Sequence, residues 1–149
     1  NARAETLTTS PAFREAFKRR RCLIPAESFY EWKRVGSVRQ PYRVVREDGR
    51  PLVFAGLWAG WKDPSSDQVR RTCTIVTTTP NEAIAGLHDR MPVIVTPSDY
   101  DRWLDPKVDS AGVKELLRPY PAPEMVAQPV GTHVNNPAND SPACAEAWE

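Results

Sequence analysis

Residues 52–61 read Leu-Val-Phe-Ala-Gly-Leu-Trp-Ala-Gly-Trp, a run rich in β-branched and aromatic side chains that predicts a β-strand. Gly56 and Gly60 indicate turns or bulges within it. Working outward, segments of the same character predict strands at 22–25, 28–33, 42–45 and 72–78. Many strands with few short helices predict an α+β fold built on a curled sheet.

Proline directly after a capping residue predicts the starts of three short helices, at Ser10-Pro11, Thr79-Pro80 and Thr96-Pro97. The second has the spacing of a capping box, so it is expected to deliver His88 just past the helix end. We also predict a helix around 113–117, a short buried strand at 93–95 and a strand within 125–134. Because the sequence shows no repeat and no linker, residues 1–149 are expected to form a single domain.

The chain has 149 residues and a mass of 16.7 kDa, and 40% of its residues are hydrophobic, which is enough for a core. Lys and Arg number 20 against 19 Asp and Glu. Any affinity for nucleic acid must therefore come from how the charge is arranged. Lys18 to Arg21 form an unbroken basic run, for which a solvated face is the alternative interpretation.

The three cysteines, Cys22, Cys73 and Cys144, are widely spaced and follow no signal-like apolar leader. This pattern indicates a reducing compartment, so we expect a cytoplasmic protein, with Cys22 and Cys73 in the core. No apolar run approaches the roughly 20 residues that cross a bilayer, and no membrane association is expected. No short Cys or His pair has zinc-site spacing, and we expect neither a metal nor another cofactor.

Two potential proton-transfer groups, Glu31 and His88, stand beside aromatic and basic residues. In a strand, Glu31 and Trp32 point to opposite faces. A partly desolvated carboxylate has a raised pKa and can exchange protons nearer neutral pH. The alternative is a glutamate paired with an arginine on a solvated strand.

His88 is expected in a polar loop, where a free imidazole titrating near neutrality could act as an acid or a base. Arg90 could hold a phosphate bidentately, or it could pair with Asp89 at the surface. The sequence contains no P-loop, no dinucleotide-binding motif, no serine-hydrolase elbow and no zinc-protease motif.

Several short motifs follow one another along nearly the whole chain: Asn1-Ala2-Arg3-Ala4-Glu5-Thr6, Arg21-Cys22-Leu23-Ile24-Pro25-Ala26, Phe29-Tyr30-Glu31-Trp32, Phe54-Ala55-Gly56-Leu57-Trp58, Thr77-Thr78-Thr79-Pro80-Asn81, His88-Asp89-Arg90-Met91-Pro92 and Val134-Asn135-Asn136. In this order they resemble the SRAP family, the SOS-response-associated peptidases. The resemblance implies an α+β SRAP-like fold, with a curled mixed or antiparallel, barrel-like β-sheet and a few short peripheral helices.

The resemblance also implies a sensor of abasic sites in single-stranded DNA. Such a protein forms a covalent thiazolidine crosslink through an N-terminal cysteine, which autopeptidase maturation exposes. By resemblance, the catalytic residues are Asn1, Glu31 and His88, and the DNA contacts are Arg3, Trp32 and Arg90. We expect a monomer acting near the nucleoid or the replication fork.

Residue 1 is Asn, whereas the family begins Met-Cys-Gly-Arg, so we expect an N-terminally truncated SRAP domain that does not crosslink DNA by itself. The internal cysteines have no free α-amine with which to form the crosslink. Two alternatives stay open: a non-covalent single-stranded DNA-binding module, and a thiol peptidase.

Overall fold

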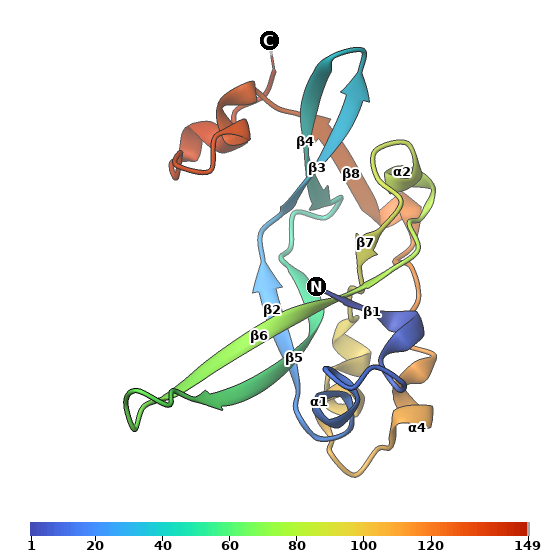
Figure 1. Cartoon of the computed structure of the whole chain (residues 1–149). Helices are drawn as coiled ribbons and strands as arrows, with labels where there is room; N and C mark the ends of the chain where they lie inside the picture. Colours follow the sequence, from blue (N-terminus) through green and yellow to red (C-terminus); the bar gives the residue numbers. More distant parts are fainter. Residues whose placement is uncertain (149) are drawn as a thin grey trace. The chain divides into compact units, whose positions relative to one another are not determined.

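A computed structural model describes residues 1–148 of the chain (Figure 1). The chain divides into two compact units, and each unit is built from three separate stretches of the sequence. The first unit comprises Asn1–Pro25, Val53–Thr79 and Pro92–Tyr120. The second comprises Ala26–Leu52, Pro80–Met91 and the described residues from Pro121 onward. That the whole chain forms a single domain stays a prediction.

A five-stranded sheet of order β1-β6-β5-β2 forms the centre of the first unit, with β7 beside β6. Its strands are β1 (Ala2–Arg3), β2 (Arg21–Ala26), β5 (Leu52–Lys62), β6 (Val69–Thr78) and β7 (Met91–Pro92). β5 and β6 are antiparallel, whereas β1 runs parallel to β6. The expected strand at 93–95 is buried, but it forms only an isolated bridge between Ile94 and Phe54.

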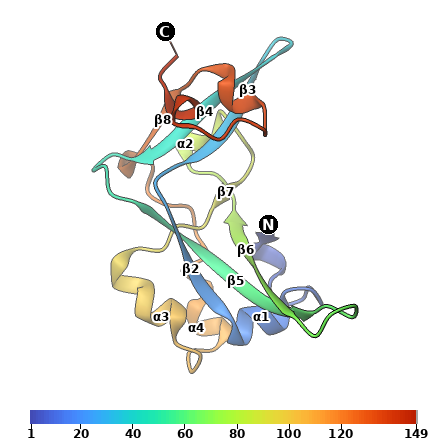
Figure 2. The same cartoon turned by 90° about the vertical axis from the view of Figure 1, so that its left-hand side faces the viewer.

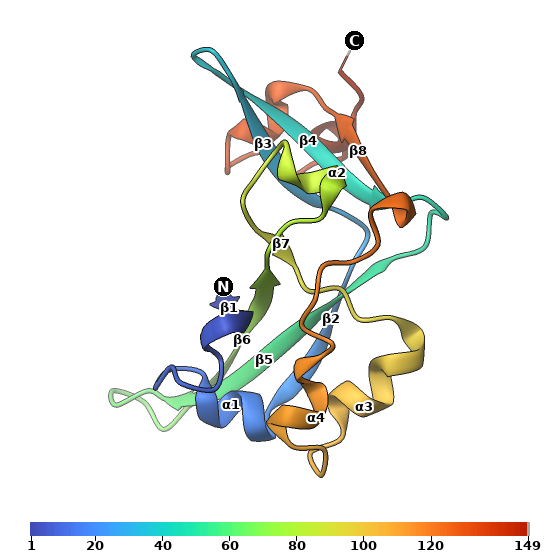
Figure 3. The same ribbon diagram turned by 90° about the vertical axis from the view of Figure 1, so that its right-hand side faces the viewer.

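Short helices accompany this sheet: η1 (Ala4–Thr6), α1 (Arg14–Arg19), η2 (Pro97–Asp99), α3 (Tyr100–Leu104) and α4 (Ser110–Lys114). Figures 2 and 3 show α1, α3 and α4 gathered beside β2 and β5. The core of the unit joins helices and sheet through apolar side chains such as Phe17, Leu57, Val76 and Trp103. Helix α1 begins later than Pro11, because residues 10–13 first form a turn that is hydrogen-bonded to the Ser10 carbonyl.

The second unit contains an antiparallel three-stranded sheet of order β3-β4-β8. These strands are β3 (Phe29–Val35), β4 (Val38–Arg46) and β8 (Met125–Pro129). The helices of this unit are α2 (Glu82–Ala85), η3 (Ala122–Glu124), η4 (Thr132–Asn135) and η5 (Pro142–Ala145). Strand β8 is therefore shorter than the range 125–134, whose last residues belong to η4.

The α+β class is confirmed, but the barrel-like curl is not. In residues 1–148 the strands divide between two sheets, each with an open strand order. Closure into a barrel would instead give every strand two neighbours. None of the described helices is both long and apolar enough to span a bilayer.

Candidate functional site

Glu31 is held in the middle of β3, where it pairs with Tyr42 of β4. Its side chain is only 17% exposed. The next residue, Trp32, points to the other face of the strand, where its indole Nε1 donates a hydrogen bond of 2.6 Å to Oδ1 of Asn135. Strand alternation thus separates the carboxylate from the indole, as the sequence predicts.

His88 follows the short helix α2. Oδ1 of Asn81 accepts a hydrogen bond of 3.1 Å from the Ile84 amide and so caps this helix. Thr79 was expected to cap the helix, but the cap is two residues later. The His88 amide donates to the Ile84 carbonyl at 3.0 Å, which fixes the histidine directly beyond the helix end.

The side chains of Glu31 and His88 meet within the second unit. Nδ1 of His88 lies 3.9 Å from Oε2 of Glu31 and 3.3 Å from Oδ1 of Asp89. The backbone amide of Arg90 donates to the same Nδ1 at 3.0 Å. Nδ1 accepts this bond in the tautomer that carries its proton on Nε2, and in the other tautomer Nδ1–H donates to the Arg90 carbonyl at 3.2 Å. On protonation, Nδ1–H gains the two carboxylates and the Arg90 carbonyl, 3.2 Å away, as acceptors.

Burial raises the pKa of Glu31. The positive charge of His88 opposes this change, and the negative charge of Asp89 adds to it. Asp89 is 84% exposed, so solvent screens its charge more strongly than that of a buried group. The protonated acid form of Glu31 therefore persists to higher pH than in an ordinary glutamate, beside an imidazole that is 47% exposed. This pair can exchange a proton with a bound molecule.

The other residues with expected roles lie in both units. Arg90 is partly buried and belongs to the second unit with Glu31 and His88. Asn1 and Arg3 belong to the first unit, where both are exposed on either side of the fully buried Ala2. Because side chains alternate along β1, Asn1 and Arg3 project from the side opposite to Ala2.

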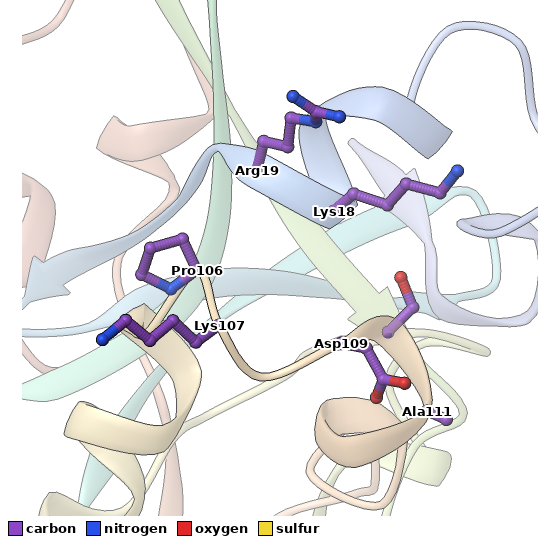
Figure 4. Close-up of a pocket in the computed structure, with 7 residues that line it drawn as sticks. Lys18, Arg19, Pro106, Lys107, Asp109 and Ala111 are labelled. Carbon is purple, nitrogen blue, oxygen red and sulfur yellow. The ribbon is translucent and has the colours of Figure 1, made fainter.

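The basic run divides into a structural and an exposed part. Nε of Arg21 donates to the Trp103 carbonyl at 2.6 Å, and its terminal nitrogens donate to further carbonyls, including that of Phe17 at 2.9 Å. Arg21 thus has a structural role: its hydrogen bonds to backbone carbonyls stabilise the first unit from within. Lys18 and Arg19 instead line a cavity of about 700 Å³. Figure 4 shows them on one side of this cavity and Lys107 with Asp109 on the other.

The cysteines do not form a thiol site with a histidine in any contact that residues 1–148 display. Cys73 is exposed, so its assignment to the core is wrong: it pairs with Trp58, on the face of the sheet opposite the core residues Leu57 and Val76. Cys22 is partly buried, and burial raises the pKa of its thiol, which disfavours the nucleophilic thiolate. No group of three or more metal-ligating His, Cys, Asp or Glu side chains occurs in the described part of the chain.

Comparison with known proteins identifies the family of this chain. The family model for SOS response associated peptidase (SRAP) matches residues 1–137. The chain belongs to the SRAP family. Abasic site processing protein YoqW of Bacillus subtilis is 45% identical over 99% of this chain, and HMCES of Xenopus tropicalis, another abasic site processing protein, is 30% identical over 99%. The chain spans 66% of the length of YoqW and 49% of that of HMCES.

Solved structures show the same SRAP architecture. A crystal structure of a Bacteroides thetaiotaomicron protein matches with a TM-score of 0.91 and 29% identity, over 99% of this chain and 66% of that protein. A Bordetella bronchiseptica protein matches with a TM-score of 0.80 and 31% identity, over 88% of this chain and 64% of the other.

Sequence reasoning missed two contributors to the site. Asp89 was considered only as a partner for Arg90, whereas its charge acts on Glu31. Asn135 was noted only as part of a family motif, whereas it anchors Trp32. The spacing of Asp89 next to His88 was the available signal for the first, and nothing local in the sequence pointed to the second.

Proposed function

We propose that this protein processes abasic sites in single-stranded DNA, as the names of its relatives suggest, and that it does so by covalent capture of the lesion. The observation that carries the proposal is the contact between Glu31 and His88: a carboxyl group with a raised pKa lies 3.9 Å from an imidazole nitrogen. Imine chemistry on an aldehyde requires an acid to expel water and a base to free the amine, and this pair supplies both.

The proposed reaction begins with the ring-opened sugar, whose C1′ is an aldehyde. The α-amine of an N-terminal cysteine adds to this carbon and gives a carbinolamine. Glu31 in its acid form protonates the hydroxyl, water leaves, and the N–H proton of the resulting iminium ion returns to Glu31, which gives the neutral imine. The cysteine thiol then adds to the imine carbon, its proton passes to the imine nitrogen, and a thiazolidine ring closes. No atom is oxidised or reduced in this sequence.

His88 is proposed to assist opening of the sugar ring and reversal of the crosslink as the Nε2–H tautomer, in which Nδ1 accepts from the Arg90 amide and Nε2–H donates to the sugar oxygen. Asn1 is proposed to orient the sugar and the nucleophile, and Arg3 and Arg90 to hold the flanking phosphates. Contact of Trp32 with DNA stays a prediction, and the hydrogen bond with Asn135 favours a packing role.

Residue 1 of this sequence is Asn, and Cys22, Cys73 and Cys144 are internal, so the proposed crosslink requires a cysteine placed before Asn1. Autopeptidase maturation that exposes this cysteine belongs to the same proposal. We also propose that the protein acts as a monomer, in the cytoplasm near the nucleoid or the replication fork.

The test joins the N-terminal segment of YoqW, a relative 45% identical to this chain, in front of Asn1. This fusion is incubated with single-stranded DNA that carries one abasic site, and a denaturing gel separates crosslinked from free DNA. We expect a shifted band with the fusion and no band with a tetrahydrofuran lesion, which has no aldehyde. Crosslinking of the tetrahydrofuran lesion would contradict the mechanism.

The role of Glu31 is tested with Glu31→Gln in the same fusion, and Glu27→Gln, an exposed glutamate of the same unit, is the matched control. General acid–base catalysis contributes roughly 100- to 10,000-fold to a rate, so we expect crosslinking to slow about 100-fold or more with Glu31→Gln only. DNA affinity before crosslinking should stay within about twofold of the parent by the same reasoning. Equal loss of affinity and of crosslinking would overturn the assignment.

A further inference from the structure

The first unit exposes one face of its β-sheet toward the tip of the β5–β6 hairpin. Leu57 of β5 and Val76 of β6 point into the core, so alternation places Gly56, Trp58 and Gly60 on the opposite face. Figures 1 and 2 show the two strands continuing beyond the helices to the hairpin loop. The side chains near this tip are therefore not covered by the helices of the unit.

Trp58 and Arg71 form a cationic aromatic surface on this face. The antiparallel register pairs Trp58 with Cys73 and Gly60 with Arg71. The guanidinium carbon of Arg71 lies 5.9 Å from the centre of the Trp58 ring, which confirms that the two side chains share a face. Trp58 is 38% exposed although it is a large apolar residue. Gly60 has no side chain, and Cγ1 of Val69 would lie 3.3 Å from a Cβ added there, so Val69 borders this part of the face.

Arg3 lies on the same face. Strand β1 pairs with β6 so that Arg3 lies beside Thr77. The side chain of Thr77 points to the same face of the sheet as those of Cys73 and Arg71, because these three residues alternate along β6. Thr77 lies four positions along β6 from Cys73 and six from Arg71, which are spans of about 13 Å and about 20 Å at a rise of about 3.3 Å per residue. Arg3, Trp58 and Arg71 thus form a strip along one sheet face, which is named here the Arg3–Trp58–Arg71 strip.

The charge of this strip is not neutralised by neighbouring acids. In the part of the chain that the structure describes, Arg3 and Arg71 form no ion pair. On the same hairpin, in contrast, Arg70 lies 3.6 Å from Asp63 and Lys62 lies 2.6 Å from Asp67. The strip therefore presents two free cations on either side of an exposed indole, which is complementary to phosphates that flank a base.

We propose that the Arg3–Trp58–Arg71 strip binds single-stranded DNA, with one base stacked on Trp58 and phosphates held by Arg3 and Arg71. The strip extends about 20 Å from Arg3 to Arg71, which matches about six stacked nucleotides at roughly 3.4 Å each. Stacking on tryptophan with phosphate contacts from arginine is a sequence-tolerant way to bind single strands. This inference rests on the proposed function, since it assigns Arg3 to a phosphate beside the abasic site.

The hairpin supplies its own matched controls. Trp61 is 52% exposed, more than Trp58, but it points to the opposite face and pairs with Arg70. We therefore compare Trp58→Ala with Trp61→Ala, and Arg71→Gln with Arg70→Gln, in the 149-residue chain. Fluorescence anisotropy of a labelled 12-nucleotide single strand containing a tetrahydrofuran lesion measures the affinity, and circular dichroism checks that each variant is folded.

We expect Trp58→Ala to weaken binding by about fivefold or more, the loss of one stacked base, and Trp61→Ala to leave it unchanged. Trp58→Phe should restore most of the affinity because phenylalanine retains a stacking ring. Arg71→Gln should reduce the slope of log K against log salt by about 0.7, the value for one phosphate contact on a single strand, while Arg70→Gln should not.

Equal losses of DNA affinity in Trp58→Ala and Trp61→Ala would overturn the proposal that the strip binds DNA. An unchanged slope of log K against log salt in Arg71→Gln would also overturn it. If the parent fusion crosslinks abasic DNA normally in that case, the proposed function stands and only the strip fails. If the parent neither crosslinks the lesion nor binds the labelled strand, both proposals fail. If Trp58→Ala changed the affinity for anionic lipid vesicles but not the affinity for DNA, that result would also contradict the proposal.

Discussion

Replacing His88 with Asn should raise the pKa of Glu31 further. The structure places the two charges 3.9 Å apart, and the charge of His88 is the influence that holds the pKa of Glu31 down. Coulomb attraction at this distance is about 4 kcal/mol at a dielectric constant of about 20, and about 1 kcal/mol in water. Because His88 is 47% exposed, screening favours the smaller value. About 1 kcal/mol corresponds to an approximately fivefold increase in the proton affinity of Glu31.

The measurement is a pH titration of the side-chain carboxyl carbon of Glu31 by NMR in ¹³C-labelled protein. Asparagine is chosen because its Oδ1 can still accept the hydrogen bond that the Arg90 amide donates to His88. Asp89→Asn is the matched comparison with the opposite sign, since the charge of Asp89 raises the pKa of Glu31. A lower or unchanged pKa in His88→Asn, or a shift in the same direction in both variants, would refute the electrostatic account of this site.

Three further predictions concern stability and are checked by urea denaturation. Arg21→Met should lower the free energy of unfolding by about 3 to 5 kcal/mol, because it leaves buried carbonyls that include that of Trp103 without their charged donor; an unchanged midpoint would refute the structural role. Asn81→Ala should cost about 1 kcal/mol and Asn81→Ser much less, since serine can still cap α2; equal costs would exclude capping as the cause. Gly56→Ala should cost about 1 to 3 kcal/mol, because an added Cβ would lie 2.7 Å from Cδ1 of Ile24. Gly86→Ala, with nothing within 4 Å, should cost less than Gly56→Ala, and the reverse order would contradict the packing argument.

The strands were predictable from the sequence because each carries a local pattern. Residues 52–61 and 72–78 lie within β5 and β6, and the rich content of β-branched and aromatic residues was a sufficient signal. Helix starts were less predictable. Proline after a capping residue predicts the start, but the turn at Ser10 and the cap at Asn81 move the first two helices later. Which side chain completes a cap depends on the local path of the backbone rather than on spacing alone.

The division of the strands between two sheets was not predictable in this way. β2 and β3 are separated by only two residues, 27–28, and such a short interval favours pairing of neighbours, yet β2 joins β5 and β3 joins β4. Pairing is decided by which faces become buried, and that is a property of the assembled unit. The exposure of Cys73 has the same origin, because alternation along β6 places it on the face opposite the core residue Val76.

The candidate site follows a different logic from the fold. Glu31 and His88 were recognised as chemically suitable residue types, but their contact joins a strand to a loop 57 positions away, and no local pattern encodes such a contact. A carboxylate whose pKa is raised by burial makes the folded protein bind more protons than the unfolded chain, so it lowers stability as pH rises through the range between the two pKa values. A purely structural glutamate on an exposed strand would have no such cost. A carboxyl group with a raised pKa beside an imidazole is suited instead to proton transfer, the role proposed for it in lesion processing.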